Sequence, residues 1–169
     1  MLFSNNDPDP LRRIQKVALK ATVFAVNEIH IGTGSGEINN EVTIPVKINN
    51  MEPFTAFQFD VSLPTGISYV EGSIVKSNRF DGHSITASVV NGNILRVIAF
   101  SMQNKNFIGS DGEVFSFKLR PNVSSGSYPL NISSATLSHP TLGNIISASY
   151  GGYLHIDAPF LWMNPSQIG

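Results

Sequence analysis

The chain has 169 residues, no cysteine and a net charge of −1, and only 14 % of its residues are charged, against roughly 25 % in average globular proteins. The absence of cysteine excludes disulfides, thiolate zinc sites and cysteine nucleophiles, and the lack of a concentrated basic patch argues against nucleic acid as a partner. No apolar run approaches the roughly 20 residues of a membrane-spanning helix.

Residues 1–18 are expected to form an N-terminal tail or arm outside the folded domain. Asn5–Pro10 shows no packing pattern, and a residue that precedes proline avoids the helical region. Leu11–Ala18 places apolar residues at helical spacing, which predicts a short helix within this arm. From residue 19 to residue 31 a period-two face carries apolar residues, which predicts the first strand: Leu19, Ala21, Val23, Ala25, Ile29 and Ile31. The glycines of Gly32–Gly36 end it.

The next two strands are the clearest in the chain. Glu41–Asn49 alternates apolar and polar residues, and Pro45 falls on the polar side. Because proline donates no hydrogen bond to a ladder, we expect it at a sheet edge or at a bulge. Ala56–Pro64 alternates in the same way, and its apolar side carries Phe57 and Phe59. These two rings bury enough apolar area to start a core.

Further strands follow at intervals of 8–12 residues. A weaker one is predicted over Ile67–Val75, and Ser84–Val90 alternates again. Asn91-Gly92 is a hairpin signal, because both residues tolerate the positive φ angles of a tight turn. Ile94–Met102 is apolar on both sides apart from Arg96, which predicts a central strand covered on both faces.

The C-terminal half completes the pattern. Glu113–Arg120 alternates with three large apolar residues on one side, and shorter strands are predicted over residues 128–132, 135–137, 145–148 and 153–156. Some nine or ten short strands separated by turns are typical of an all-β sandwich or barrel. The domain is expected to span residues 19–157, and residues 158–169 form an apolar C-terminal tail.

Three stretches together resemble the cohesin-like domains, in particular those in surface proteins of Bacteroidetes-type bacteria: EVTIPVKINN (41–50), FTAFQFDVSLPTGISYV (54–70) and the hairpin region 85–119. The resemblance covers about residues 20–156. It implies an antiparallel two-sheet β-sandwich of about nine strands with jelly-roll topology. It also implies a scaffolding role at a cell surface or in an extracellular assembly, where the best-known members bind calcium-loaded dockerin modules through one sheet face.

The sequence offers no catalytic constellation. The four histidines are scattered without metal-ligand spacing, no serine lies in a Gly-x-Ser-x-Gly elbow, and most acidic residues fall in turns or on polar strand sides. The glycines of Gly32–Gly36 are not followed by the Lys-Ser/Thr of a phosphate-binding loop. We therefore expect no enzyme activity, no metal site and no cofactor.

Binding residues are expected in loops and tails, since a rigid scaffold usually presents its function there. The candidates are polar residues near the predicted central hairpin and an apolar cluster in the C-terminal tail: Arg79, Arg96, Gln103, Asn104 and Lys105, and Phe160, Leu161, Trp162 and Met163.

Three functions remain open from the sequence. The first is a non-catalytic protein-interaction module that binds a dockerin-like partner or copies of itself. The second is a structural subunit of a large assembly, such as a phage capsid-decoration or fibre protein, docked by its termini and located on the virion. The third is a carbohydrate-binding module, with Tyr150 and Tyr153 as a platform for a sugar ring.

Overall fold

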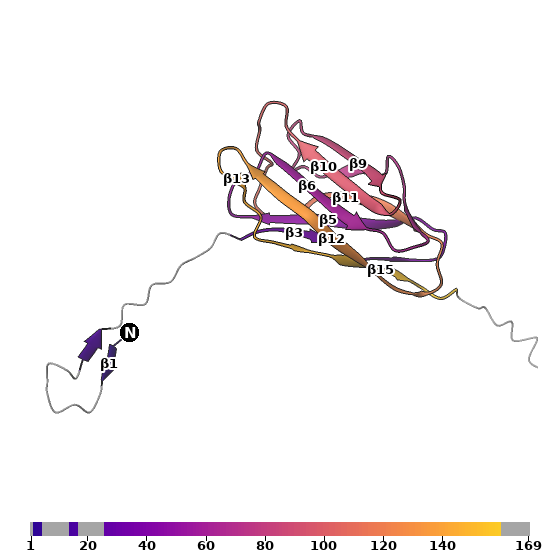
Figure 1. The fold of residues 1–169 in the computed structure, drawn as a ribbon, viewed down its shortest axis with the longest axis horizontal. Helices are drawn as coiled ribbons and strands as arrows, with labels where there is room; N and C mark the ends of the chain where they lie inside the picture. Colours follow the sequence, from indigo (N-terminus) through magenta and orange to yellow (C-terminus); the bar gives the residue numbers. More distant parts are fainter. Residues whose placement is uncertain (1, 5–13, 17–25, 160–169) are drawn as a thin grey trace, which may run out of the picture.

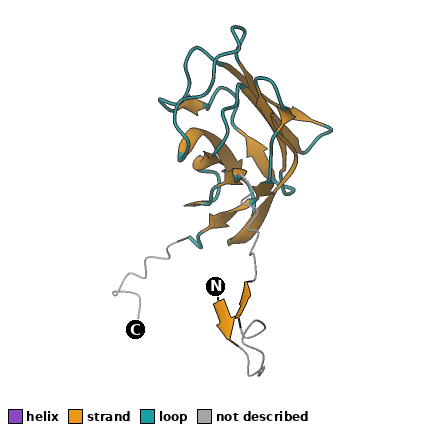
Figure 2. Ribbon diagram, turned by 90° about the vertical axis from the view of Figure 1, so that its left-hand side faces the viewer, coloured by secondary structure: helices purple, strands orange, loops and turns teal. Residues whose placement is uncertain are grey.

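The computed structural model describes residues 2–4, 14–16 and 26–159, and every regular element in them is a strand (Figure 2). β1 (Leu2–Ser4) and β2 (Ile14–Lys16) form an antiparallel ladder of their own. The short helix predicted over Leu11–Ala18 is therefore wrong at residues 14–16, where the backbone is extended and paired. The remainder of that prediction lies outside the described residues.

The other strands form two sheets that face each other, as Figure 1 shows. The first sheet has seven strands in the order β4-β15-β12-β6-β10-β9, with β13 beside β12. Their bounds are Gly34–Gly36 (β4), Gly152–Ile156 (β15), Gly126–His139 (β12), Ala56–Ser62 (β6), Ile94–Phe100 (β10), Ser84–Val90 (β9) and Gly143–Asn144 (β13). The prediction of an all-β two-sheet sandwich is confirmed.

The second sheet has six strands in the order β14-β3-β5-β11-β7, with β8 beside β11. Their bounds are Ala148–Tyr150 (β14), Asn27–Ile31 (β3), Val42–Asn50 (β5), Glu113–Pro121 (β11), Ile67–Tyr69 (β7) and Val75–Lys76 (β8). The described residues thus place thirteen strands in the sandwich, where about nine were predicted.

The higher count reflects strands that are shorter than predicted. The strand predicted over residues 67–75 is divided into β7 and β8 by a turn at Gly72, whose φ is 72°. The strand predicted over residues 145–148 is wrong, because residues 145–147 are irregular and separate β13 from β14. Conversely, the strands predicted over 128–132 and 135–137 are one strand, β12, with a register shift at Ser134.

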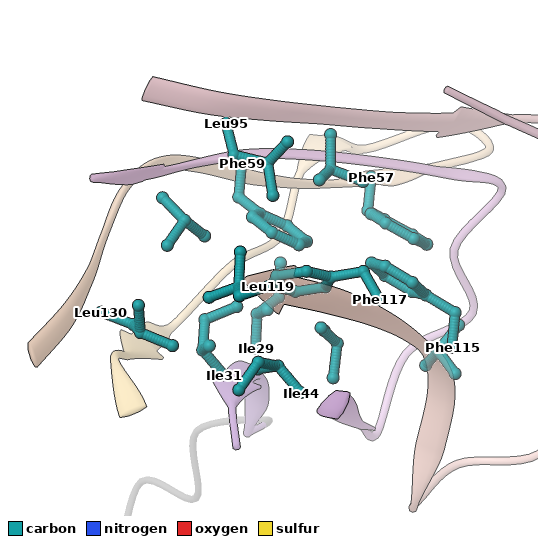
Figure 3. Close-up of a cluster of buried hydrophobic side chains, with 14 of the residues drawn as sticks. Ile29, Ile31, Ile44, Phe57, Phe59, Leu95, Phe115, Phe117, Leu119 and Leu130 are labelled. Carbon is teal, nitrogen blue, oxygen red and sulfur yellow. The ribbon is translucent and has the colours of Figure 1, made fainter. Parts of the chain in front are cut away.

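Phenylalanines from both sheets meet in the core, as Figure 3 shows. Phe57 and Phe59 point inward from β6, and Phe115 and Phe117 point inward from β11; all four are buried. The ring centroids of Phe57 and Phe115 lie 5.8 Å apart, and those of Phe59 and Phe115 lie 6.2 Å apart. Removing this apolar area from water stabilises the sandwich, and the prediction that Ala56–Pro64 carries an inner face is confirmed.

Pro45 lies on the outer side of β5, as predicted, but β5 pairs with both β3 and β11, so the predicted edge position is wrong. The last residue pair between β3 and β5 is Ile31 with Val46. Just beyond it, the backbone N–H of Gly32 donates to the carbonyl oxygen of Pro45 over 2.7 Å. Proline is tolerated there because its nitrogen faces the place where β3 has ended.

The hairpin between β9 and β10 confirms the Asn91-Gly92 signal, with φ angles of 52° and 84° in a turn over residues 91–93. The prediction that the following strand is covered on both faces is wrong for the described part of the chain. β10 has a neighbour on each side, and its inner residues are buried, but on the outer face Ile98 is half-buried and Phe100 is 38 % exposed. An apolar outer surface is therefore left open.

Candidate binding face

The outer surfaces of the two sheets differ in charge. Strands β6, β9, β10 and β12 contain one acidic and one basic residue between them, Asp60 and Arg96. Strands β3, β5 and β11 of the other sheet contain five charged residues: Glu28, Lys47, Glu113, Lys118 and Arg120. Depletion of charge together with an arginine and an aromatic residue is typical of the centre of a protein interface.

Asp60 and Arg96 form an ion pair in the middle of the charge-poor surface. They lie directly opposite each other on β6 and β10, and the guanidinium binds the carboxylate with two bonds, Nε to Oδ1 and Nη2 to Oδ2, each 2.8 Å long. The hydrogen bond from Arg96 lowers the pKa of Asp60, against the opposing effect of burial. The Asp60 side chain is only 6 % exposed and that of Arg96 is 41 % exposed, so the surface presents the guanidinium and hides the carboxylate.

This pair lies in the first of three cross-strand rows, whose other members are small or polar residues and the apolar residues Ile98, Phe100 and Ala56. In the order β9, β10, β6, β12, the rows are Ser88, Arg96, Asp60, Ser133; Thr86, Ile98, Gln58, Thr136; and Ser84, Phe100, Ala56, Ser138. We call these twelve residues the binding face. The strands that carry it lie side by side in Figure 1, so the face extends across the sheet with its apolar centre on β10.

The predicted binding residues that the structure describes lie in three different places. Arg96 lies on the binding face. Gln103, Asn104 and Lys105 are exposed in the loop that follows β10, at the end of the face beyond Phe100. Lys105 Nζ pairs there with Asp81 Oδ2 at 3.2 Å. Arg79 is in the interior, and the cluster Phe160, Leu161, Trp162 and Met163 lies outside the described residues.

Arg79 is 4 % exposed, which does not fit the predicted role of a surface contact. Its guanidinium donates to four backbone carbonyls and one side-chain amide: Nε to Ile108 O (2.7 Å), Nη1 to Ile48 O (2.5 Å) and Gly112 O (3.3 Å), and Nη2 to Asn50 Oδ1 (2.6 Å) and Gly109 O (3.1 Å). Burial lowers its pKa, and Asp111 acts in the opposite direction. Arg79 therefore ties the end of β5 to the loop before β11.

His83 links the loop before β9 to the loop after β10 by hydrogen bonds. It is 2 % exposed and lies against the ring of Phe107, with centroids 3.7 Å apart. Its Nδ1 accepts a hydrogen bond from the backbone N–H of Asp81 (3.1 Å), and its Nε2 faces the carbonyl oxygen of Lys105 (3.0 Å). A backbone N–H can only donate and a carbonyl can only accept, so these neighbours select the neutral ring with its proton on Nε2.

This arrangement predicts a loss of stability in acid. Burial lowers the pKa of His83 from 6.5; the Lys105 carbonyl and the Asp81 carboxylate oppose this effect, whereas the Lys105 and Lys76 charges add to it. The folded chain therefore binds fewer protons than the unfolded chain, and the contribution of His83 is present above about pH 6.5 and lost as the pH falls below it. We expect the free energy of unfolding, measured in urea between about pH 7.5 and 5, to fall more steeply for the unchanged chain than for His83→Gln. Equal slopes would contradict this.

Two hollows among the described residues hold no catalytic arrangement. The larger one, about 540 Å³, is lined by Val26, Asn49, Asn50, Met51, Ser110 and Asp111 and contains a single carboxylate. In a smaller one of about 270 Å³ Glu37 and Asp157 lie near each other, but both are exposed. Within the described ranges no three histidine or acidic side chains gather as a metal site would require, and no helix there could cross a bilayer.

The two tyrosines expected to form a sugar platform belong to different sheets. Tyr150 is on β14 and stacks on His30 at a centroid distance of 4.7 Å. Tyr153 is on β15 and stacks on His155 at 6.0 Å. Each ring is paired within its own sheet, so the geometry gives no support to a joint platform.

The sequence profile of the cohesin domain matches residues 27–149, well over half of the chain. The chain belongs to the cohesin family. This confirms the resemblance found in the sequence, and it assigns the chain to a family of non-catalytic modules for protein–protein interaction. Comparison with curated protein sequences finds no match.

Solved cohesin structures share the fold. A non-cellulosomal cohesin from the archaeon Archaeoglobus fulgidus superposes with a TM-score of 0.61 at 17 % identity, over 80 % of this chain and 93 % of that one. A cohesin in a type I cohesin–dockerin complex from Clostridium thermocellum gives 0.68 at 17 % identity, over 78 % and 99 %. A cohesin of Acetivibrio cellulolyticus in complex with a dockerin gives 0.66 at 17 % identity, over 79 % and 100 %. These matches confirm the jelly-roll sandwich.

Of the twelve residues of the candidate binding face, only Arg96 was predicted from the sequence as a binding residue. Ile98 and Phe100 were interpreted as buried under a second layer, and the outward residues Thr86 and Gln58 were not considered. The alternation that identified the inner faces of β6 and β9 also identifies their outer faces. The signal was therefore present in the strands, whereas the candidates were sought in the loops.

Proposed function

We propose that this cohesin binds a dockerin-like protein module through the binding face. The observation that carries the proposal is the contrast between the two outer surfaces. The strands of one surface carry a single ion pair, Asp60–Arg96, beside Ile98 and Phe100, and the strands of the other carry five charged residues. Desolvating the first surface costs little, because few charges lose water. The dockerin complexes of the structural relatives support a partner of this kind.

We propose that Arg96 determines the orientation in which the partner binds. Its Nε and Nη2 atoms are used by Asp60, and no described residue binds Nη1. The bidentate pair fixes the guanidinium plane before any partner arrives, so little side-chain entropy is lost on binding. The open N–H groups favour a partner that brings a carboxylate or backbone carbonyls to this point.

We expect Ile98→Lys to weaken binding at least tenfold, because it places an unpaired charge at the centre of an interface. Isothermal titration calorimetry against a panel of calcium-loaded dockerin modules would measure this. Thr43→Lys is the matched control, since residue 43 is exposed on β5 of the other sheet and should leave affinity unchanged. Equal effects of the two substitutions would place the contact elsewhere.

The family supports a site of action outside the cell or on its surface. Cohesins work outside the cell or on its surface, and we propose the same location for this one. The absence of cysteine is compatible with that setting, because the buried phenylalanine core gives a domain of this size stability without crosslinks.

A further inference from the structure

β9 forms one border of the seven-stranded sheet. It pairs with β10 over all seven residues, from Ser84 opposite Phe100 to Val90 opposite Ile94, and no other strand in the described part of the chain pairs with it. Figure 1 shows it along the outer margin of the sheet. Alternate backbone N–H and C=O groups of β9 therefore face away from the sheet and can accept another strand.

The strand carries none of the features that usually prevent such pairing. Natural edge strands are interrupted by proline or a bulge, or are guarded by lysine or another charge. The β9 sequence is Ser-Ile-Thr-Ala-Ser-Val-Val, which has no charge, no proline and no glycine, and its register with β10 is uninterrupted. It is a regular, uncharged edge with three β-branched aliphatic residues.

Beside this edge, apolar side chains of both sheets are exposed to solvent. Val89 on β9 is 43 % exposed and Val75 on β8 of the other sheet is 63 % exposed. The two strands lie on the same side of the sandwich, because Lys76 Nζ on β8 donates to the carbonyl oxygen of His83, the residue before β9, at 2.8 Å. A strand added to β9 would extend the sheet and cover this side.

We propose that the occupant is β9 of a second copy of the chain, paired antiparallel about a twofold axis at Ala87. In that register Ile85 faces Val89 of the partner subunit and Thr86 faces Ser88 of the partner subunit, so the aliphatic pairs lie on the inner side and the hydroxyl pairs on the outer side. Such cross-strand pairs stabilise an antiparallel ladder.

The self-complementarity favours a second copy over an unrelated strand. The two inner pairs on each side of the axis match like with like, aliphatic with aliphatic and hydroxyl with hydroxyl, and at the ends Ser84 meets the uncharged Val90 of the partner subunit. The smallest side chain, Ala87, lies on the axis. Reversal about Ala87 also brings the start of one strand, where Asp81 and Lys105 lie, to the uncharged turn Asn91–Asn93 of the other copy. No like charges meet, and an isologous contact of this type closes as a dimer.

Sedimentation velocity of the full chain, from about 10 µM to 1 mM, tests the dimer. The mass should approach twice that of the 18.3 kDa chain as the concentration rises. Thr86→Lys with Ser88→Lys should abolish the shift, because the new charges face each other across the axis. Asn131→Lys with Ser133→Lys adds the same charge to exposed positions on β12, an inner strand of the same sheet, and should leave the dimer intact.

A crosslink tests the register. The chain has no cysteine, so Ala87→Cys supplies a single thiol that the axis brings opposite its copy, within reach of a disulfide. Oxidation should give a covalent dimer for Ala87→Cys and monomer for Ser133→Cys. A monomer at every concentration without crosslinking, or a dimer that survives the double lysine substitution, would overturn the proposal. Dockerin binding is tested separately by Ile98→Lys on β10, because Thr86, Ser88 and Ser133 belong to the binding face.

Discussion

Gly152→Ala is expected to cost the sandwich about 3 kcal/mol of unfolding free energy or more, because the new methyl group has no space. The chain passes from one sheet to the other twice at this point, between β3 and β4 and between β14 and β15, and the two crossings lie backbone against backbone. A Cβ on Gly152 would overlap the carbonyl oxygen of Gly32 and lie 2.6 Å from that of Ile31. Urea unfolding followed by circular dichroism measures the loss.

Gly143→Ala separates this effect from the general cost of replacing glycine. Gly143 has a φ of 81° and no atom within 4 Å of an added Cβ, so only the backbone conformation resists the change, at about 1 kcal/mol. If Gly152→Ala cost no more than Gly143→Ala, the close crossing of the two chain segments would be contradicted.

Arg79→Met is the second change with a large expected effect, a loss of about 3–5 kcal/mol. Methionine fills much of the same space but donates no hydrogen bond. The buried carbonyl of Ile48, the buried amide oxygen of Asn50 and the part-buried carbonyl of Ile108 therefore lose the donor that Arg79 supplies. A loss of this size should be visible as a lower urea midpoint. The loop before β11 should also exchange its amide hydrogens faster.

Arg120→Met is the control for Arg79→Met. Arg120 is 52 % exposed and pairs with Glu41 at the surface, where such pairs contribute little. We expect its urea midpoint to remain close to that of the unchanged chain. If both substitutions lowered the midpoint equally, the buried network around Arg79 would not be the cause.

The period-two pattern predicted the strands whose one face is buried against the other sheet. β5 and β6 were found almost to their ends, and the Asn91-Gly92 turn was found because its φ angles are a local property of those residues. β12 was predicted as two separate strands because Ser134, with a φ of 51°, interrupts the apolar–polar alternation without ending the strand. A bulge and a turn give the same local signal, and only the pairing with β6 separates them.

The candidate site was harder to predict, since its residues depend on long-range contacts. Arg79 was interpreted as a surface residue because it lies in a polar loop. The carbonyl groups that accept its hydrogen bonds lie about 30 residues away along the chain, on either side of it. The outer side of β10 was interpreted as covered because Ile98 and Phe100 are apolar. Composition alone does not distinguish an apolar face covered by the chain itself from one that is left for a partner.

The central claim is that the sheet of β6, β9, β10 and β12 is the contact surface of this cohesin. Hydrogen–deuterium exchange of the chain with and without a bound calcium-loaded dockerin tests it most directly. We predict that protection increases along β10 and at the bordering residues of β6 and β9, with β3, β5 and β11 unchanged. Protection confined to β3, β5 and β11 would contradict the claim.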